Sequence, residues 1–108
     1  MGAVSVKLDP RGNVAIERLD FFQLNRLDFL KIDAEGAEMQ ILVGAKKILR
    51  KFQPVLLIEL NRPALLKFNT TPEKIRAFLK FHRYCVVPSE PHHSFTMDQL
   101  DALCIPFL

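Results

Sequence analysis

The sequence lacks several features that mark particular classes of protein. No segment stays apolar for the roughly 18 residues that a membrane-spanning helix needs, and the N-terminus lacks the layout of a signal peptide. No run of five like charges occurs, and the net charge is only +3, so a nucleic-acid-binding arm is not expected. Only two cysteines occur, Cys85 and Cys104. We therefore expect a cytoplasmic protein with free thiols that binds neither nucleic acid nor a membrane.

The chain does contain enough apolar residues to form the core of one small domain. Its 108 residues are 49% hydrophobic, which is sufficient for a core at this length. We treat residues 1–108 as a single domain. Within it, we predict an N-terminal hairpin over 1–18, a strand–helix–strand core over 27–60, and a helix with terminal strands over 70–108.

The N-terminal hairpin is predicted from two alternating segments separated by a turn. Residues 4–8 and 14–18 have the alternation of strands. Between them lies "DPRGN", in which Pro10 restricts the backbone and Gly12 with Asn13 tolerates the left-handed conformation.

The central segment predicts two parallel strands joined by a helix. Residues 27–33 have the pattern of an apolar strand. From Ala37 to Phe52 the apolar residues recur with the spacing of one helical face, and Pro54 ends the predicted helix. The run "VLLIEL" at 55–60 is continuously apolar, which is typical of a parallel strand covered on both faces. The fold class is therefore α/β with a right-handed βαβ unit.

The C-terminal part predicts one helix followed by two strands. Thr71 is placed to cap a helix over 72–82, and Thr70 with Glu73 has capping-box spacing. Residues 84–87 have strand character, and "ALCIPF" at 102–107 adds a short final strand.

Three acids follow the strand at 27–33, and two interpretations of them stand side by side. Ligands of open α/β sheets bind beyond the carboxyl ends of strands, where Asp33, Glu35 and Glu38 are placed. Glu38 lies on the buried stripe of its helix and is expected to point towards the strand ends. Acids also favour any helix N-terminus, so Asp33 is equally read as a cap, with Lys31 as a partner for Glu59. From spacing alone, the capping interpretation is the simpler one.

The segment "LDFLKIDAEGAEMQILVGAKKILRKFQPVLLIEL" at 27–60 resembles the core signature of FkbM-family methyltransferases. That signature runs hydrophobic-Lys-Ile-Asp-x-Glu-Gly-x-Glu, then Leu-x-Gly-Ala, then Pro-x-hydrophobic-hydrophobic-x-Glu. "IERLD" at 16–20 is similar to the family's Thr-Leu-Asp segment, although Arg18 replaces the usual Thr. The signature positions are occupied here by Lys31, Ile32, Asp33, Glu35, Gly36, Glu38, Leu42, Gly44, Ala45, Pro54 and Glu59.

The resemblance implies a partial Rossmann-like fold and O-methyl transfer from S-adenosylmethionine to a hydroxyl compound. It also implies that the last strand inserts antiparallel between its neighbours. The implied catalytic residues are Asp33, Glu35, Glu38 and Lys31, and the implied substrate-binding residues are Glu59 and Asn61. Asp33 with Glu35 could alternatively hold a divalent cation. His92 and His93 match no standard zinc spacing, so no metal site is assigned.

Few glycines are present, and this matters for the cofactor. The family's cofactor half carries a glycine-rich turn, whereas this chain has only Gly2, Gly12, Gly36 and Gly44. The chain is therefore similar to the C-terminal half of the family's domain, and we do not expect it to bind S-adenosylmethionine alone. The alternative is a non-catalytic module that self-associates or pairs with a cofactor-binding chain.

A missing first half would leave one edge of the central strand open. We therefore expect unpaired backbone groups along Phe29–Asp33 and exposure of Leu30 or Ile32, together with part of the Ile41/Leu42/Ile48 stripe. The N-terminal hairpin could fold over and shield this surface, but a five-residue strand is a small cover. The surface therefore predicts a homodimer, or pairing with a complementary chain.

Overall fold

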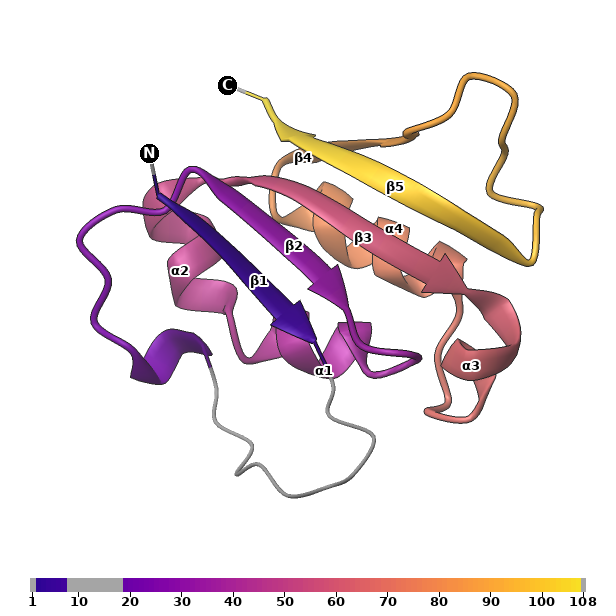
Figure 1. The fold of residues 1–108 in the computed structure, drawn as a ribbon, viewed down its shortest axis with the longest axis horizontal. Coiled ribbons are helices and arrows are strands. Elements are labelled where there is room, and N and C mark those ends of the chain that lie inside the picture. The colour runs from indigo at the N-terminus through magenta and orange to yellow at the C-terminus, as the bar shows by residue number, and fades with distance from the viewer. Residues whose placement is uncertain (1, 8–18, 108) are drawn as a thin grey trace.

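Within the part of the chain that the structure describes, five strands make one mixed sheet in the order β1-β2-β3-β5-β4 (Figure 1). The computed structural model describes residues 2–7 and 19–107. The strands are β1 (Ala3–Lys7), β2 (Phe29–Asp33), β3 (Val55–Asn61), β4 (Tyr84–Pro88) and β5 (Gln99–Pro106). The helices are the 3-10 turn η1 (Leu19–Phe21), α1 (Glu38–Val43), α2 (Lys46–Phe52), α3 (Arg62–Leu66) and α4 (Pro72–Phe81).

The predicted α/β fold class is confirmed. Strands β2 and β3 are parallel and are joined through α1 and α2. Strand β5 lies antiparallel between β3 and β4, as the resemblance implied. Cys85 and Cys104 are free, and the pairing of Val86 with Cys104 places the two thiols on opposite faces of the sheet.

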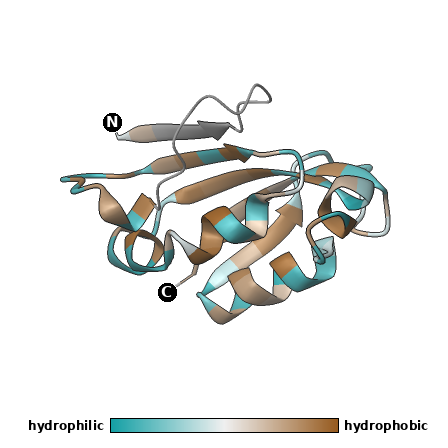
Figure 2. Ribbon diagram, turned by 90° about the horizontal axis from the view of Figure 1, so that it is seen from below, coloured by the Kyte–Doolittle hydropathy of each residue, from teal (hydrophilic) through white to brown (hydrophobic). Residues whose placement is uncertain are grey.

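Helices cover one face of this sheet, as the view along the sheet shows (Figure 2). Burial therefore alternates along β3: Leu56, Ile58 and Leu60 are buried, whereas the residues between them are only half-buried. The prediction that β3 is covered on both faces is wrong for the part of the chain that the structure describes. Its apolar run contains Val55 and Leu57 on the second, open face.

The single helix predicted from Ala37 to Phe52 is in fact two helices. Helix α1 ends at Gly44, and α2 begins after Ala45, whose backbone leaves the helical region. Asp20 stabilises the break, because its carboxylate oxygens accept the N–H groups of Lys47 and Ile48 at 3.0 and 2.9 Å. The backbone N–H of Asp20 also donates to the Gly44 carbonyl at 3.0 Å. A cap that comes from 27 residues away cannot be read from helical periodicity.

The predicted open edge of β2 is filled by β1. Strand β1 pairs parallel to β2, with Ala3 opposite Phe29 and Lys7 opposite Asp33. The predicted exposure of Leu30 or Ile32 is also wrong, because both are fully buried. Within the helical stripe Leu42 is fully buried and Ile48 is 5% exposed, whereas Ile41 is half-buried. Strand β1 covers the edge, and α1 and α2 cover the face. The second predicted hairpin strand, at 14–18, lies outside the described residues.

The start of α4 was predicted in part from its capping residues. Thr71 caps α4 by accepting the N–H of Lys74, as predicted. Thr70 does not take part in a capping box: its buried hydroxyl has no hydrogen-bond partner, and Glu73 instead binds Arg62. Helix α3 was not predicted. None of the helices in the described ranges is both long and apolar enough to span a bilayer.

Candidate functional site

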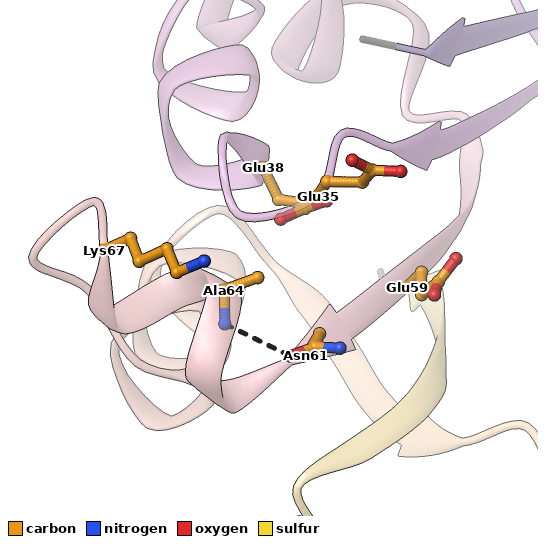
Figure 3. Close-up of a pocket in the computed structure, with 6 residues that line it drawn as sticks. All are labelled: Glu35, Glu38, Glu59, Asn61, Ala64 and Lys67. Atoms are coloured by element: carbon orange, nitrogen blue, oxygen red, sulfur yellow. Dashed lines mark hydrogen bonds between the residues drawn. The ribbon is translucent and has the colours of Figure 1, made fainter. Parts of the chain in front are cut away.

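A pocket of about 300 Å³ lies beyond the carboxyl ends of β2 and β3, where an α/β sheet is expected to bind its ligand (Figure 3). The turn after β2 supplies one wall and the end of β3 another. Helix α3 closes the third side. The lining residues are Glu35, Glu38, Glu59, Asn61, Ala64 and Lys67. Four of the six residues were predicted from sequence, and Ala64 and Lys67 were not.

The turn after β2 is shaped by Gly36. Its φ of +111° is a conformation that side chains rarely adopt. A Cβ atom placed on Gly36 would lie 2.4 Å from the carbonyl oxygen of Ala64 and 2.8 Å from the Phe68 ring. The glycine therefore permits both the turn and the close approach of α3, which gives the pocket its third wall.

Glu38 has a structural role in this turn. Its side chain is only 1% exposed, and its two oxygens accept the backbone N–H groups of Ala34 at 2.7 Å and Gly36 at 2.9 Å. The prediction that it points towards the strand ends is confirmed. Both oxygens are nevertheless used by the backbone, so this carboxylate braces the turn and has little capacity left for a substrate.

Asp33 does not cap α1, whose N-cap residue is Ala37. It lies on the open face of the sheet, at the end of a row of carboxylates. Glu59 follows Ile58, the register partner of Ile32, so it stands beside Asp33 on the next strand, and Asp101 of β5 lies directly opposite Glu59. Three acids from three neighbouring strands are thus adjacent.

This row changes the acidity of its central member. Partial burial raises the pKa of Glu59, and a hydrogen bond with Asp33 and the negative charges of Asp33 and Asp101 raise it further. A hydrogen bond donated by Gln99 at 3.1 Å acts in the opposite direction. Glu59 therefore takes up a proton more readily than an ordinary glutamate does.

Helix α3 completes the pocket through local capping. The Asn61 side-chain oxygen accepts the N–H of Ala64 at 3.1 Å, and Pro63 occupies the first helical turn. The amide nitrogen of Asn61 stays on the pocket side, near Glu59, and Lys67 extends from the end of the helix (Figure 3). The site thus combines acceptors, one amide donor and one ammonium group.

Lys31 lies apart from the pocket, although the family resemblance implied a catalytic role for it. It is exposed on the open face, two residues before Asp33, with Leu57 as its register partner on β3. Within the described ranges it forms no ion pair with either Asp33 or Glu59. In the same ranges, no group of three or more His, Cys, Asp or Glu side chains is arranged to hold a metal ion.

Besides Ala64 and Lys67, sequence reasoning also missed Asp101 and Gln99, which adjoin Glu59. The predicted final strand began at 102, whereas β5 begins at Gln99. The alternation of "QLDALC" was the available signal, because it places Gln99 and Asp101 on one face and Leu100 and Ala102 on the other.

The chain matches the methyltransferase FkbM domain over residues 8–86. It belongs to the FkbM methyltransferase family. Neither curated proteins nor solved structures give a significant match. The family match spans the turn with Glu35 and Glu38 and the end of β3, so the pocket belongs to the part of the chain that defines the family.

The FkbM assignment suggests S-adenosylmethionine as the methyl donor, but the described residues do not fit this cofactor. Its binding needs a glycine turn that leaves backbone open to the ligand. Gly36 faces Ala64 of α3, Gly2 faces the Arg26 carbonyl, and Gly44 ends α1 in a right-handed helical conformation. Gly12 lies outside the described residues. No step of the reaction is therefore assigned to a cofactor held by these residues.

Proposed function

We propose that this FkbM domain provides the acceptor side of an O-methyltransferase. The supporting observation is a pocket in which one carboxylate, Glu59, has a raised proton affinity beside Asp33 and Asp101. The acceptor is a hydroxyl compound that enters the pocket between Glu35 and Glu59. Lys67 and the Asn61 amide then donate hydrogen bonds to its other oxygens.

The chemical role of Glu59 is that of a general base. It takes the proton of the acceptor hydroxyl, which leaves the electron pair on the oxygen and makes that oxygen a nucleophile. The carboxylate becomes a neutral carboxylic acid, and this relieves repulsion from Asp33 and Asp101. A base is most effective when its pKa lies near the working pH, so a raised pKa favours this role.

The methyl donor is supplied by a cofactor-binding part that these residues do not form. We expect calorimetry of the chain with S-adenosylmethionine or S-adenosylhomocysteine to show no binding. Clear one-to-one binding would contradict this part of the proposal. It would also mean that the cofactor site lies within this chain.

The base assignment is tested in a chimaera that joins this chain to the cofactor-binding half of another FkbM protein. Glu59→Gln should lower the rate of methyl transfer by about a hundredfold or more. Asp101→Asn is the matched control, since it removes a neighbouring charge and leaves the base. It should change the pH profile more than the maximal rate. Full activity of Glu59→Gln would contradict the base role.

A non-catalytic assembly module is the second candidate. The open face of the sheet favours it: Ile105 is 45% exposed, Val87 is 38% exposed, and Leu57 is half-buried on the same face. Within the described ranges no helix covers these side chains. Such a module would form a homodimer, or bind a cofactor-binding chain, through this face. Sedimentation at tens of micromolar tests it, and a monomer that Leu57→Ser leaves unchanged would contradict it.

A further inference from the structure

A second hollow lies on the opposite side of the helical layer from the candidate site. It measures about 400 Å³ and is bordered by η1, the segment after it and one side of α2. It shares no lining residue with the first pocket. None of its residues has a role in the function proposed above.

The walls of this hollow combine apolar and polar side chains, and the apolar part is built largely from aromatic rings. The Phe22 ring is 51% exposed and meets Phe21 edge-on, with ring centroids 5.9 Å apart. Phe52 and Leu24 are half-buried, and Ile48 forms part of the floor. Large ring surfaces that face a hollow of this size favour a flat apolar group, because burying it removes both surfaces from water.

The charge of the hollow is positive. Lys47 and Lys51 lie one turn apart on α2 and both border it. The acid among the lining residues is Asp20, and its two oxygens already accept the N–H groups of Lys47 and Ile48. Lys51 is held over the Phe52 ring, with its nitrogen 5.1 Å from the centroid. Two ammonium groups thus stand beside the aromatic side chains at the edge of the hollow.

We propose that this hollow binds a small organic anion that has an aromatic body and one carboxylate, phosphate or sulfonate group. The aromatic body lies between Phe22 and Phe52, and the anionic group lies between Lys47 and Lys51. The exposed amides of Gln23 and Asn25 supply further hydrogen bonds. The site is separate from methyl transfer and does not depend on it.

The probe for this site is anilinonaphthalenesulfonate, which combines an aromatic body with one sulfonate. We expect saturable one-to-one binding that weakens as salt is added. The uncharged analogue phenylnaphthylamine should bind more weakly. Amide shifts in nuclear magnetic resonance spectra should be confined to residues 20–25 and 47–52. Shifts confined to the open face of the sheet would overturn the proposal.

A pair of double variants separates local charge from total charge. Lys47→Gln with Lys51→Gln should lower the affinity about five- to tenfold, since each exposed pairing contributes modestly. Lys46→Gln with Arg50→Gln is the matched control. It removes the same charge from the same helix, at side chains whose charges act on His82 of α4. That control should change the affinity less than about twofold.

Equal losses in the two double variants would overturn the site, because only the total charge would then matter. Phe22→Ser should also weaken binding several-fold without unfolding the chain, since this ring is largely in solvent. Binding of the chain to vesicles of anionic lipid, without saturable binding of the free probe, would assign the surface to membrane docking and overturn the pocket.

Discussion

The two strand ends that border the candidate site are built in different ways. The turn after β2 is held in place by buried hydrogen bonds and close packing. Glu38 accepts two backbone N–H groups, and Gly36 packs against α3. The end of β3 holds a half-buried Glu59 in a row of like charges. Two glutamates that line one pocket therefore have opposite consequences for stability. One supports the scaffold, and the other carries a cost that is expected of a functional group.

The largest effect is expected when the brace is removed. Glu38→Ala leaves the N–H groups of Ala34 and Gly36 buried without acceptors, which costs about 3–5 kcal/mol of unfolding free energy. Denaturant titration measures it. Glu35→Ala is the control in the same turn, and since Glu35 is exposed its change should stay within about 0.5 kcal/mol. Equal losses for both variants would mean that Glu38 has no special role.

The next largest effect is expected at Gly36, where a substitution tests whether the position of α3 depends on the turn after β2. Gly36→Ala forces a side chain into the left-handed region and against the Ala64 carbonyl, which is 2.4 Å from the new Cβ. We expect a loss of about 2–3 kcal/mol together with amide shift changes in α3. A stable variant with unchanged α3 signals would show that the turn and helix are not coupled.

The same contrast separates the structural features that could be predicted from the sequence alone from those that could not. Local patterns placed β2, the capped start of α4 and the buried direction of Glu38, because each depends on neighbouring residues. Resemblance to FkbM proteins placed β5 between β3 and β4. It did not distinguish Glu38, which braces the turn through two backbone N–H groups, from Asp33, which stands beside Glu59 on the open face.

The features that were missed depend on residues far apart in the chain. Asp20 caps α2 across 28 residues, so the break at Gly44 carries no local signal except the glycine itself. The pairing of β1 with β2 rests on backbone register and not on a motif. Asp101 joined the site only because antiparallel pairing sets it opposite Glu59. Contacts of this kind can be predicted only when the order and direction of the strands in the sheet are already known.

A smaller effect, of opposite sign, is expected at the β3 end. The raised pKa of Glu59 means that its charged form is disfavoured in the folded state. Stability therefore rises as the pH falls from neutral through this raised value, and the gain is complete below the ordinary value of 4.5. Glu59→Gln should stabilise the chain at pH 7 by less than about 1 kcal/mol, since solvent screens these charges. Thermal unfolding at pH 7 and pH 4 measures it, and a destabilised variant would contradict the repulsion.

The smallest effect concerns how α3 is held on its outer side. Arg62 donates to both carboxylate oxygens of Glu73 on α4, at 2.9 and 2.7 Å, and to the Phe95 carbonyl. This pairing lowers the pKa of Glu73 to about 2. Because the folded pKa is lowered, the stabilisation is present above the ordinary value of 4.5 and is lost as the pH falls from there towards about 2.

Glu73→Gln should therefore remove the part of the acid sensitivity that lies between pH 4.5 and about 2. At pH 7 the variant should lower Tm by only a few degrees, since surface pairs contribute little. Glu90→Gln is the control, because Glu90 is an exposed acid in the loop between β4 and β5. If both variants keep the acid sensitivity of the parent chain, the pair does not hold α3. The β3 side of the pocket would then depend on the Asn61 cap and on packing alone.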